Sequence, residues 1–374
     1  MLCPQKFYNE LRKNEIHFFT GVPDSLLKSL CAYITDNVSE KSHIIAANEG
    51  GAIALAMGYH LATGKIPLIY MQNSGLGNAI NPLLSLADPD IYSVPMLLVL
   101  GWRGQPGTKD EPQHRKQGKV MLAMLEAMEI PFLILSNESS IAAKQLQEAT
   151  ESAKKQSCPF AIIVEKDTFE SYSLKNTLTP IASLTREEAI NCVVSHLTPE
   201  DIVVATTGMA GRELFEIRKA KGYKGDSDFL TIGGMGHASQ IALGLAIQQP
   251  NRRVYCIDGD GAILMHMGSL AIIGQLQCSN LIHIAINNGA HDSVGGQPTA
   301  AASLDLTKIA QAVGYHQAYS ASSITEISKY LNQMSSSSCF LEIKTKIGAR
   351  SDLGRPTTTP GENKDKLMSF IQCA

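Results

Sequence analysis

One stretch of the chain, residues 254–288, restricts the fold more than any other. It reads as a buried strand, the turn Gly259-Asp260-Gly261, an apolar helix, a second buried strand and the pair Asn287-Asn288. Twenty-seven residues separate Asp260 from Asn287, which is enough for a right-handed strand–helix–strand crossover. The two strand ends then lie side by side at the carboxyl edge of a parallel sheet, where ligands usually bind. This places Asp260 and the Asn pair within reach of one cation.

The same stretch also suits an anion. Its glycines let the backbone approach a bulky group, and a helix beginning near Ala262 offers free N–H groups to phosphate. Oxygen ligands beside such donors are typical of Mg²⁺ bridging a diphosphate. An EF-hand is excluded by Ile263 and Ser269, and a dinucleotide-binding motif by Leu264, because these positions lack the glycines and glutamate that the motifs require. A structural turn without a ligand is the remaining alternative.

Gly259-Asp260-Gly261 followed by Asn287-Asn288 resembles the signature of the thiamine-diphosphate enzymes, which hold the diphosphate of their cofactor through Mg²⁺. Three further stretches look like the phosphonopyruvate decarboxylases in particular: residues 206–208, 233–237 and 291–299. The resemblance covers nearly the whole chain and implies a carbon–carbon lyase with thiamine diphosphate and Mg²⁺ as cofactors. It also implies Asp260, Asn288 and the carbonyl of Ala290 as metal ligands, although the residues alone do not decide between Asn287 and Asn288.

Alternating strands and helices on both sides of a Ser/Thr-rich stretch predict an α/β protein with open parallel sheets. The segments 53–58 and 241–246 are similar, which favours two copies of one fold. With the resemblance, this predicts two similar doubly wound parallel-sheet domains of the thiamine-diphosphate-binding type, without the middle domain that many relatives carry. We expect a pyrimidine-binding-type domain over 1–168, a linker over 169–185 and a diphosphate- and Mg-binding domain over 186–374.

Composition limits the partners. The net charge is −3 and 18% of the residues are charged, so the electrostatic footprint of a nucleic-acid-binding protein is absent. No run of 18 apolar residues and no signal-peptide pattern occur, so no membrane segment is expected. The eight cysteines are scattered without a Cys-x-x-Cys pair, which is typical of reduced thiols. The protein is therefore expected to be cytoplasmic.

Glu49 is the candidate for activating the cofactor. It lies between Asn48 and Gly50 at the start of a predicted small-residue helix, where an unpaired buried carboxylate is costly. Complementing the helix dipole is the alternative role. By resemblance, Glu49 matches the acid that contacts the aminopyrimidine ring and activates the cofactor. The other cofactor-binding candidates, for some of which core filling or helix capping is the alternative, are Thr206, Thr207, Gly208, Gly234, Met235, Gly259, Asp260, Gly261, Ala262 and Asn288.

Asp24 and His114 are the candidates for protonating the reaction intermediate after CO₂ leaves, which is a general-acid step. Asp24 is equally placed as the N-cap of a helix over 26–33, and His114 lies in a stretch, 101–118, that reads as an irregular polar loop. A phosphonate or sulfonate substrate needs positive charge or N–H donors. The substrate-binding candidates are Asn73, Ser74, Arg103, Lys109, His291, Ser293 and Gln297.

The resemblance implies decarboxylation of 3-phosphonopyruvate to phosphonoacetaldehyde and CO₂, in phosphonate biosynthesis. Sulfopyruvate decarboxylase, another 2-oxo acid decarboxylase and a carboligase are alternatives within the class. A catalytically silent cofactor-binding partner is the alternative from a different class, although such a protein has no chemical need for Glu49. Active sites of the family lie between subunits, so a homodimer or higher homo-oligomer is expected.

Overall fold

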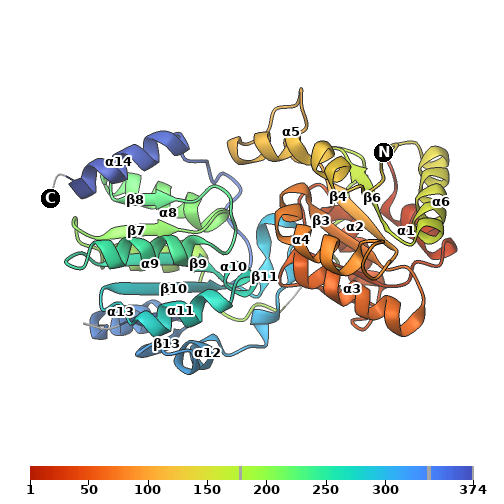
Figure 1. Cartoon of the computed structure of the whole chain (residues 1–374). Helices are drawn as coiled ribbons and strands as arrows, with labels where there is room; N and C mark the ends of the chain where they lie inside the picture. Colours follow the sequence, from red (N-terminus) through yellow and green to blue (C-terminus); the bar gives the residue numbers. More distant parts are fainter. Residues whose placement is uncertain (177–178, 335–337, 373–374) are drawn as a thin grey trace. The chain divides into compact units, whose positions relative to one another are not determined.

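The computed structural model describes residues 1–176, 179–334 and 338–372 (Figure 1). The chain divides into two compact units, an N-terminal unit of Met1–Thr177 with His291–Gln297 and a C-terminal unit of Leu178–Ala290 with Pro298–Ala374. The expected domain boundaries at 168 and 186 lie on either side of this division. No helix in the described part of the chain is long and apolar enough to cross a membrane.

The N-terminal unit is built on one parallel sheet of six strands in the order β2-β1-β3-β4-β6-β5. Its strands are β1 (Phe19–Gly21), β2 (His43–Ile45), β3 (Leu68–Gln72), β4 (Met96–Gly101), β5 (Phe132–Ile134) and β6 (Pro159–Val164). Its main helices are α1 (Pro4–Lys13), α2 (Lys28–Asn37), α3 (Glu49–Thr63), α4 (Leu76–Pro82), α5 (Pro112–Ala127) and α6 (Ser139–Gln156).

The C-terminal unit has a second parallel sheet of six strands, in the order β13-β14-β10-β9-β7-β8. Its strands are β7 (Ile202–Ala205), β8 (Asp228–Leu230), β9 (Val254–Gly259), β10 (Leu281–Asn287), β13 (Gln317–Ala321) and β14 (Cys339–Lys344). Its helices are α7 (Arg186–Val194), α8 (Met209–Ala220), α9 (Ala238–Gln248), α10 (Asp260–Met265), α11 (Gly268–Leu276), α12 (Leu306–Ala312), α13 (Ile324–Gln333) and α14 (Pro360–Gln372). A small pair of strands, β11 (Ala290–His291) and β12 (Gln297–Pro298), interrupts the alternation.

The two sheets have the same topology. When each set of strands is numbered in chain order, both sheets read 2-1-3-4-6-5 across. Thus β3 and β4 of the N-terminal unit correspond to β9 and β10 of the C-terminal unit, and α3 corresponds to α9. The similar segments 53–58 and 241–246 lie in these two corresponding helices, which confirms the prediction of two copies of one fold.

Each sheet is apolar on both faces, as a parallel sheet covered by helices must be. In β4 the alternate residues Leu97 and Val99 join one core cluster, whereas Met96, Leu98 and Leu100 join the other. The central strands of the C-terminal sheet likewise divide between two clusters. Both faces of each sheet are therefore covered by packed side chains. Because the strands are parallel, the polar residues that follow them lie at the carboxyl edge of each sheet.

Several local predictions were wrong. The loop expected over 101–118 is helical from Pro112, whose fixed φ suits the first position of a helix, so His114 lies in the first turn of α5. Asp24 is not the N-cap of α2, which begins at Lys28 behind Leu27 without a side-chain cap. The single helix expected between the two strands begins at Asp260, close to the expected start near Ala262, but it is divided into α10 and α11. The sequence analysis also missed α4, β13 and the β11–β12 pair.

Candidate active site

The carboxyl edge of the N-terminal sheet carries one polar residue after each of four neighbouring strands. Asp24 follows β1, Glu49 follows β2, Asn73 follows β3 and Arg103 follows β4. Since all four strands are parallel, these side chains meet at one edge. The structure thus brings together residues that lie up to 79 positions apart in the chain.

Glu49 is the first residue of α3 and is buried, with 6% of its surface exposed. The N-cap is its neighbour Asn48, whose Oδ1 accepts a bond from the N–H of Gly51 at 2.7 Å, so Glu49 is not needed for capping. Asn78 Nδ2 donates to Glu49 Oε2 at 2.7 Å. Burial raises the pKa of Glu49, and the bond from Asn78 opposes that shift. The Glu49 carboxyl is therefore held in one place and has a raised pKa, which suits a group that exchanges a proton.

Gly75 leaves the space that the Glu49 side chain occupies. A Cβ at position 75 would lie 2.6 Å from Cγ and from Oε1 of Glu49, closer than real Cβ atoms approach any heavy atom. By contrast, a Cβ at Gly77, two residues further along the chain, would have no atom within 4 Å. The packing of residues 73–78 against Glu49 therefore depends on one glycine.

Asp24 is almost fully buried, with 1% of its surface exposed. Its Oδ2 accepts a bond from the N–H of Leu26 at 2.9 Å, and its Oδ1 has no hydrogen-bond partner among the described residues. Burial raises the pKa of Asp24 to about 6, although the Leu26 N–H and the positive charge of Arg103 both lower it. A carboxyl with such a pKa is a suitable general acid near neutral pH.

The buried charge of Asp24 predicts a gain in stability for Asp24→Asn at alkaline pH. The pKa is about 6 in the folded protein and 3.8 without the shift, so ionisation opposes folding fully above pH 6 and not at all below pH 3.8. We expect the variant to be more stable at pH 8 by on the order of 2–3 kcal/mol, and by much less at pH 4. Thermal unfolding at the two pH values measures this, and an equal or lower midpoint at pH 8 would contradict it.

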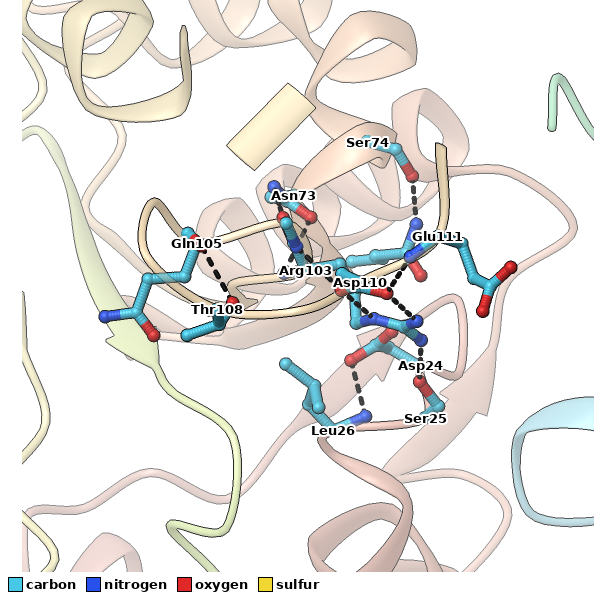
Figure 2. A network of polar contacts seen from close by, with 12 residues as sticks. Asp24, Ser25, Leu26, Asn73, Ser74, Arg103, Gln105, Thr108, Asp110 and Glu111 are labelled. Carbon is cyan, nitrogen blue, oxygen red and sulfur yellow. Dashed lines mark hydrogen bonds and ion pairs between the residues drawn. The ribbon is translucent and has the colours of Figure 1, made fainter. Parts of the chain in front are cut away.

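Arg103 lies at the centre of a polar network that Figure 2 shows. Its Nε and Nη2 donate to the two oxygens of Asp110 at 2.8 and 2.5 Å, and its Nη1 donates to Ser25 Oγ at 2.7 Å. Its backbone is fixed as well, since Asn73 Nδ2 donates to its carbonyl at 2.8 Å and its N–H donates to Asn73 Oδ1 at 3.2 Å. The position and the orientation of this guanidinium are both set by the fold.

The other candidates of this unit differ in their surroundings. Ser74 Oγ accepts a bond from Gln72 at 2.5 Å, next to the network. Lys109 is exposed. Burial, followed by the charge of Arg103, lowers the pKa of His114 to about 4. His114 is therefore neutral at pH 7, and Asp24 is the better proton donor of the two candidates at that pH.

In the C-terminal unit, the corresponding edge is formed by the ends of β7, β9 and β10. Thr206, Thr207 and Gly208 follow β7, and Thr207 Oγ1 donates to the carbonyl of Ile232 at 3.0 Å. Gly208 has φ of 99°, a conformation that favours glycine. Gly259 ends β9, and Asp260 opens α10 with Gly261 and Ala262 in its first turn. At this edge a helix begins directly after a strand ends, which is the arrangement that phosphate sites commonly use.

Asp260 and the Asn pair lie at the ends of adjacent strands, as the sequence predicted. The register pairs Ile286 with Gly259, which places Asn287 beside Asp260. Asp260 Oδ2 accepts a bond from Thr299 at 2.5 Å, and burial raises its pKa to about 6. Asn287 is committed to the sheet, because its Nδ2 donates to Glu342 Oε1 at 2.8 Å and its Oδ1 accepts from the N–H of Gly289 at 3.0 Å.

Asn288 and Ala290 complete an all-oxygen donor set near Asp260. Asn288 is buried, and its Oδ1 accepts a bond from the N–H of Ala290 at 3.0 Å. A buried carboxylate with a raised pKa lacks a counter-charge, and a bound divalent cation supplies one. Carboxylate, amide and carbonyl oxygens are the ligands that Mg²⁺ prefers. The residues present therefore fit a magnesium ion that holds a diphosphate.

The loop before α9 and the segment after β10 carry the remaining candidates. Gly234 has φ of 62° and precedes Met235, which is half-buried. His291 ends β11, Ser293 lies in the short 3₁₀ turn Asp292–Val294, and Gln297 begins β12. The division of the chain groups 291–297 with the N-terminal unit.

Sequence reasoning missed several contacts at these sites. Asp110 is one of three consecutive charged residues and carried no pattern of its own, although it fixes Arg103. Ser25, whose Oγ accepts a bond from Arg103 Nη1, was not among the candidates. His266 was not considered, yet a Cβ at Gly236 would lie 2.6 Å from its Cδ2, so it packs under the loop of Met235. Such contacts depend on the tertiary fold and leave no periodic signal.

Comparison with known proteins agrees with this geometry. The N-terminal thiamine pyrophosphate-binding domain matches residues 4–143, and the C-terminal one matches residues 204–343. A phosphonopyruvate decarboxylase of Streptomyces viridochromogenes is 30% identical, over 94% of this chain and 90% of its own length. A sulfopyruvate decarboxylase of Methanosarcina acetivorans is 28% identical over 83% of this chain and 82% of its own. A sulfopyruvate decarboxylase subunit beta of Methanocaldococcus jannaschii is 33% identical over 50% of this chain and 97% of its own.

The matched domains cover both sheets, and the likeness to whole decarboxylases spans nearly the full chain. Over the described residues, the sheets are two copies of one parallel fold, and no middle domain separates them in the chain. The chain therefore belongs to the thiamine-diphosphate enzymes, as a decarboxylase of the phosphonopyruvate and sulfopyruvate type.

Proposed function

We propose that the protein decarboxylates 3-phosphonopyruvate to phosphonoacetaldehyde and CO₂, with thiamine diphosphate and Mg²⁺ as cofactors. The observation that carries this proposal is the group at the N-terminal sheet edge: a buried carboxyl held by Asn78, a second carboxyl with a pKa of about 6, and a fixed guanidinium. They suit proton exchange with the cofactor, protonation of the product and neutralisation of an anionic substrate. Whole-chain likeness to phosphonopyruvate decarboxylases favours the phosphonate.

The cofactors would be held mainly by the C-terminal edge. Asp260, Asn288 and the Ala290 carbonyl are proposed as ligands of Mg²⁺, and Asn288 is preferred over Asn287 because Asn287 Nδ2 is bonded to Glu342 on the neighbouring strand. Gly208 and Gly259 leave room for the diphosphate at the strand ends. Thiamine diphosphate, when bound, supplies a nucleophilic carbon and an electron sink for the loss of CO₂.

The residues of the chain perform the proton steps in this proposal. Glu49 exchanges a proton with the aminopyrimidine at its Oε1 or Oε2, and burial keeps both protonation states accessible. Asp24 delivers the proton that the product aldehyde requires, since its pKa is close to neutral pH. Met235 is proposed to support the cofactor from the loop before α9.

The proposal is tested by measuring CO₂ and aldehyde release from phosphonopyruvate, sulfopyruvate and pyruvate, each with and without thiamine diphosphate and Mg²⁺. We expect cofactor-dependent turnover that strongly favours phosphonopyruvate. A preference for sulfopyruvate would transfer the proposal to the related acid, and a product formed only with an acceptor aldehyde would indicate a carboligase. Absence of turnover on all three acids, with the cofactor bound, would overturn the decarboxylase and support a silent partner.

We also propose a homodimer or higher homo-oligomer in which the N-terminal unit of one subunit and the C-terminal unit of another complete each site. Glu49 and Asp24 lie in the first unit, whereas Asp260 and Asn288 lie in the second. Each unit thus supplies one part of the machinery.

A further inference from the structure

We propose that Arg103 is a preformed receptor for the terminal oxyanion of the substrate, and that Asp110 and Ser25 position it. The inference rests on the proposed function for the identity of the substrate, but not for the existence of the site. The ligand class is a tetrahedral oxyanion on a short carbon chain, either a phosphonate or a sulfonate. A guanidinium suits both, because its parallel N–H groups match two oxygens at once.

The contacts of Arg103 fix one side of its guanidinium and leave donors on the other. Three of its five N–H groups donate, two to the oxygens of Asp110 and one to Ser25. The remaining N–H groups, one on Nη1 and one on Nη2, have no hydrogen-bond acceptor among the described residues, and the side chain is 20% exposed. Nη1 and Nη2 thus each keep one N–H group with which to donate to an oxyanion.

Asp110 is held by backbone N–H groups as well as by Arg103. Its Oδ2 also accepts a bond from the N–H of Gly104 at 2.8 Å, and its Oδ1 one from the N–H of Glu111 at 2.7 Å. Burial alone would raise the pKa of Asp110, but the hydrogen bond from Arg103 and the bond from the N–H of Gly104 outweigh it, so the pKa is lowered. The carboxylate is therefore a fixed, ionised support, so an incoming anion would bind to the opposite edge of the guanidinium rather than displace Asp110.

The shared topology of the two units gives a second, independent argument. Asn73 follows β3 as Asp260 follows β9, and Arg103 follows β4 as Asn288 follows β10. In the C-terminal unit this position carries the oxygen ligands that fit a cation, and through it a diphosphate. In the N-terminal unit the acid is replaced by Asn73 and the cation is a side chain of the protein. The same edge of the fold can thus hold a phosphorus oxyanion in both units, once through a metal and once through Arg103.

Asp24 lies beside the guanidinium in Figure 2, and the charge of Arg103 lowers its pKa against the effect of burial. Its Oδ1 has no hydrogen-bond partner among the described residues and is fully buried. In its protonated form this carboxyl can donate a bond to an oxyanion, whereas in its ionised form it repels one. A receptor of this kind distinguishes a substrate with a terminal oxyanion from one that ends in a methyl group.

Binding of phosphonoacetate to the complete protein tests the receptor without any turnover. Phosphonoacetate is not a 2-oxo acid, so the enzyme cannot decarboxylate it. Titration calorimetry measures its affinity directly, and sulfoacetate and acetate serve as comparison ligands. We expect Arg103→Gln to weaken phosphonoacetate binding at least about 10-fold and to leave the weak binding of acetate unchanged. The affinity of Arg103→Lys for phosphonoacetate should lie between those of the wild type and Arg103→Gln, because lysine keeps the positive charge but lacks the paired N–H groups of the guanidinium. Lys116→Gln, which removes the same charge from an exposed position of α5, should bind as the wild type does.

Asp110→Asn separates positioning from simple electrostatics. Removing a negative charge next to Arg103 would tighten anion binding if only the charge mattered, whereas loss of orientation weakens it. We expect phosphonoacetate to bind several-fold more weakly to this variant and to Ser25→Ala, and KM for phosphonopyruvate to rise with little change in kcat. Tighter binding by Asp110→Asn, or wild-type binding by Arg103→Gln, would overturn the inference. If no acid is turned over while phosphonoacetate still depends on Arg103, the proposed function fails and the receptor stands.

Discussion

Glu49→Gln is expected to lower kcat by about 10²–10⁴-fold, the usual contribution of a positioned acid–base group. Glutamine has the same shape, and its amide oxygen can still accept the bond from Asn78 that Oε2 accepts in the wild type at 2.7 Å. What it cannot do is exchange a proton with the cofactor. Because Glu49 is buried and its pKa is raised, losing the carboxyl removes a desolvation cost, so the thermal midpoint should not fall.

The decisive comparison is between turnover and cofactor binding in the same variant. Glu49→Gln should bind thiamine diphosphate and Mg²⁺, since Asp260 and Asn288 are unchanged, and yet fail to release CO₂. Glu126→Gln, an exposed substitution of the same type on α5, should behave as the wild type. Wild-type turnover by Glu49→Gln would remove Glu49 from the mechanism.

Gly75→Ala changes the position of the Glu49 carboxyl without changing its chemistry. The added Cβ would lie 2.6 Å from Cγ and from Oε1 of Glu49, so the carboxyl must shift although its chemistry is intact. We expect a loss of turnover that approaches that of Glu49→Gln, while Gly77→Ala, whose Cβ meets nothing within 4 Å, should remain active. Equal activity of the two alanine variants would show that the exact position of Glu49 does not matter.

The fold could be predicted from the sequence because its strands are apolar runs of limited length, each followed by a polar or glycine-rich turn. Val254–Gly259 and Leu281–Asn287 are adjacent parallel strands, as the crossover between them implied. The loop over 101–118 was misread because residues 113–119 contain no apolar side chain that would show a helical period, although Pro112 suits the first position of a helix. Tertiary contacts here override local polarity.

The site was only partly predictable. Glu49, Asp24 and Arg103 were identified as candidates, and the structure brings them to one sheet edge. The partners that fix them, Asn78 for Glu49 and Asp110 for Arg103, lie 29 and 7 residues away and reach them only through the fold. A sequence pattern identifies the reactive group more readily than its support, because any polar residue at the correct place in space can provide the support.

Asp260→Asn is expected to weaken Mg²⁺-dependent binding of thiamine diphosphate by more than about 100-fold, since even the partners of metal ligands are worth 10–100-fold. Asparagine can still accept the bond from Thr299 that Asp260 Oδ2 accepts at 2.5 Å, so the turn should survive and only the charge is lost. Titration of the cofactor at several Mg²⁺ concentrations measures the effect. Asp365→Asn, a change of an exposed aspartate on α14, is the matched control. Unchanged cofactor affinity in Asp260→Asn would exclude Asp260 as a ligand.

Mixing Asp260→Asn with Glu49→Gln tests where each site is completed. Neither variant alone has an intact pair of Glu49 and Asp260. If a site combines the N-terminal unit of one subunit with the C-terminal unit of another, each mixed dimer has one site with both substitutions and one site with neither. Random mixing makes about half of the dimers mixed, so roughly a quarter of wild-type turnover should return, in accord with the two-fold symmetry of such a dimer. If both units of one chain form the site, every site keeps one substitution and no turnover returns, because exchange of subunits cannot repair a site within a chain.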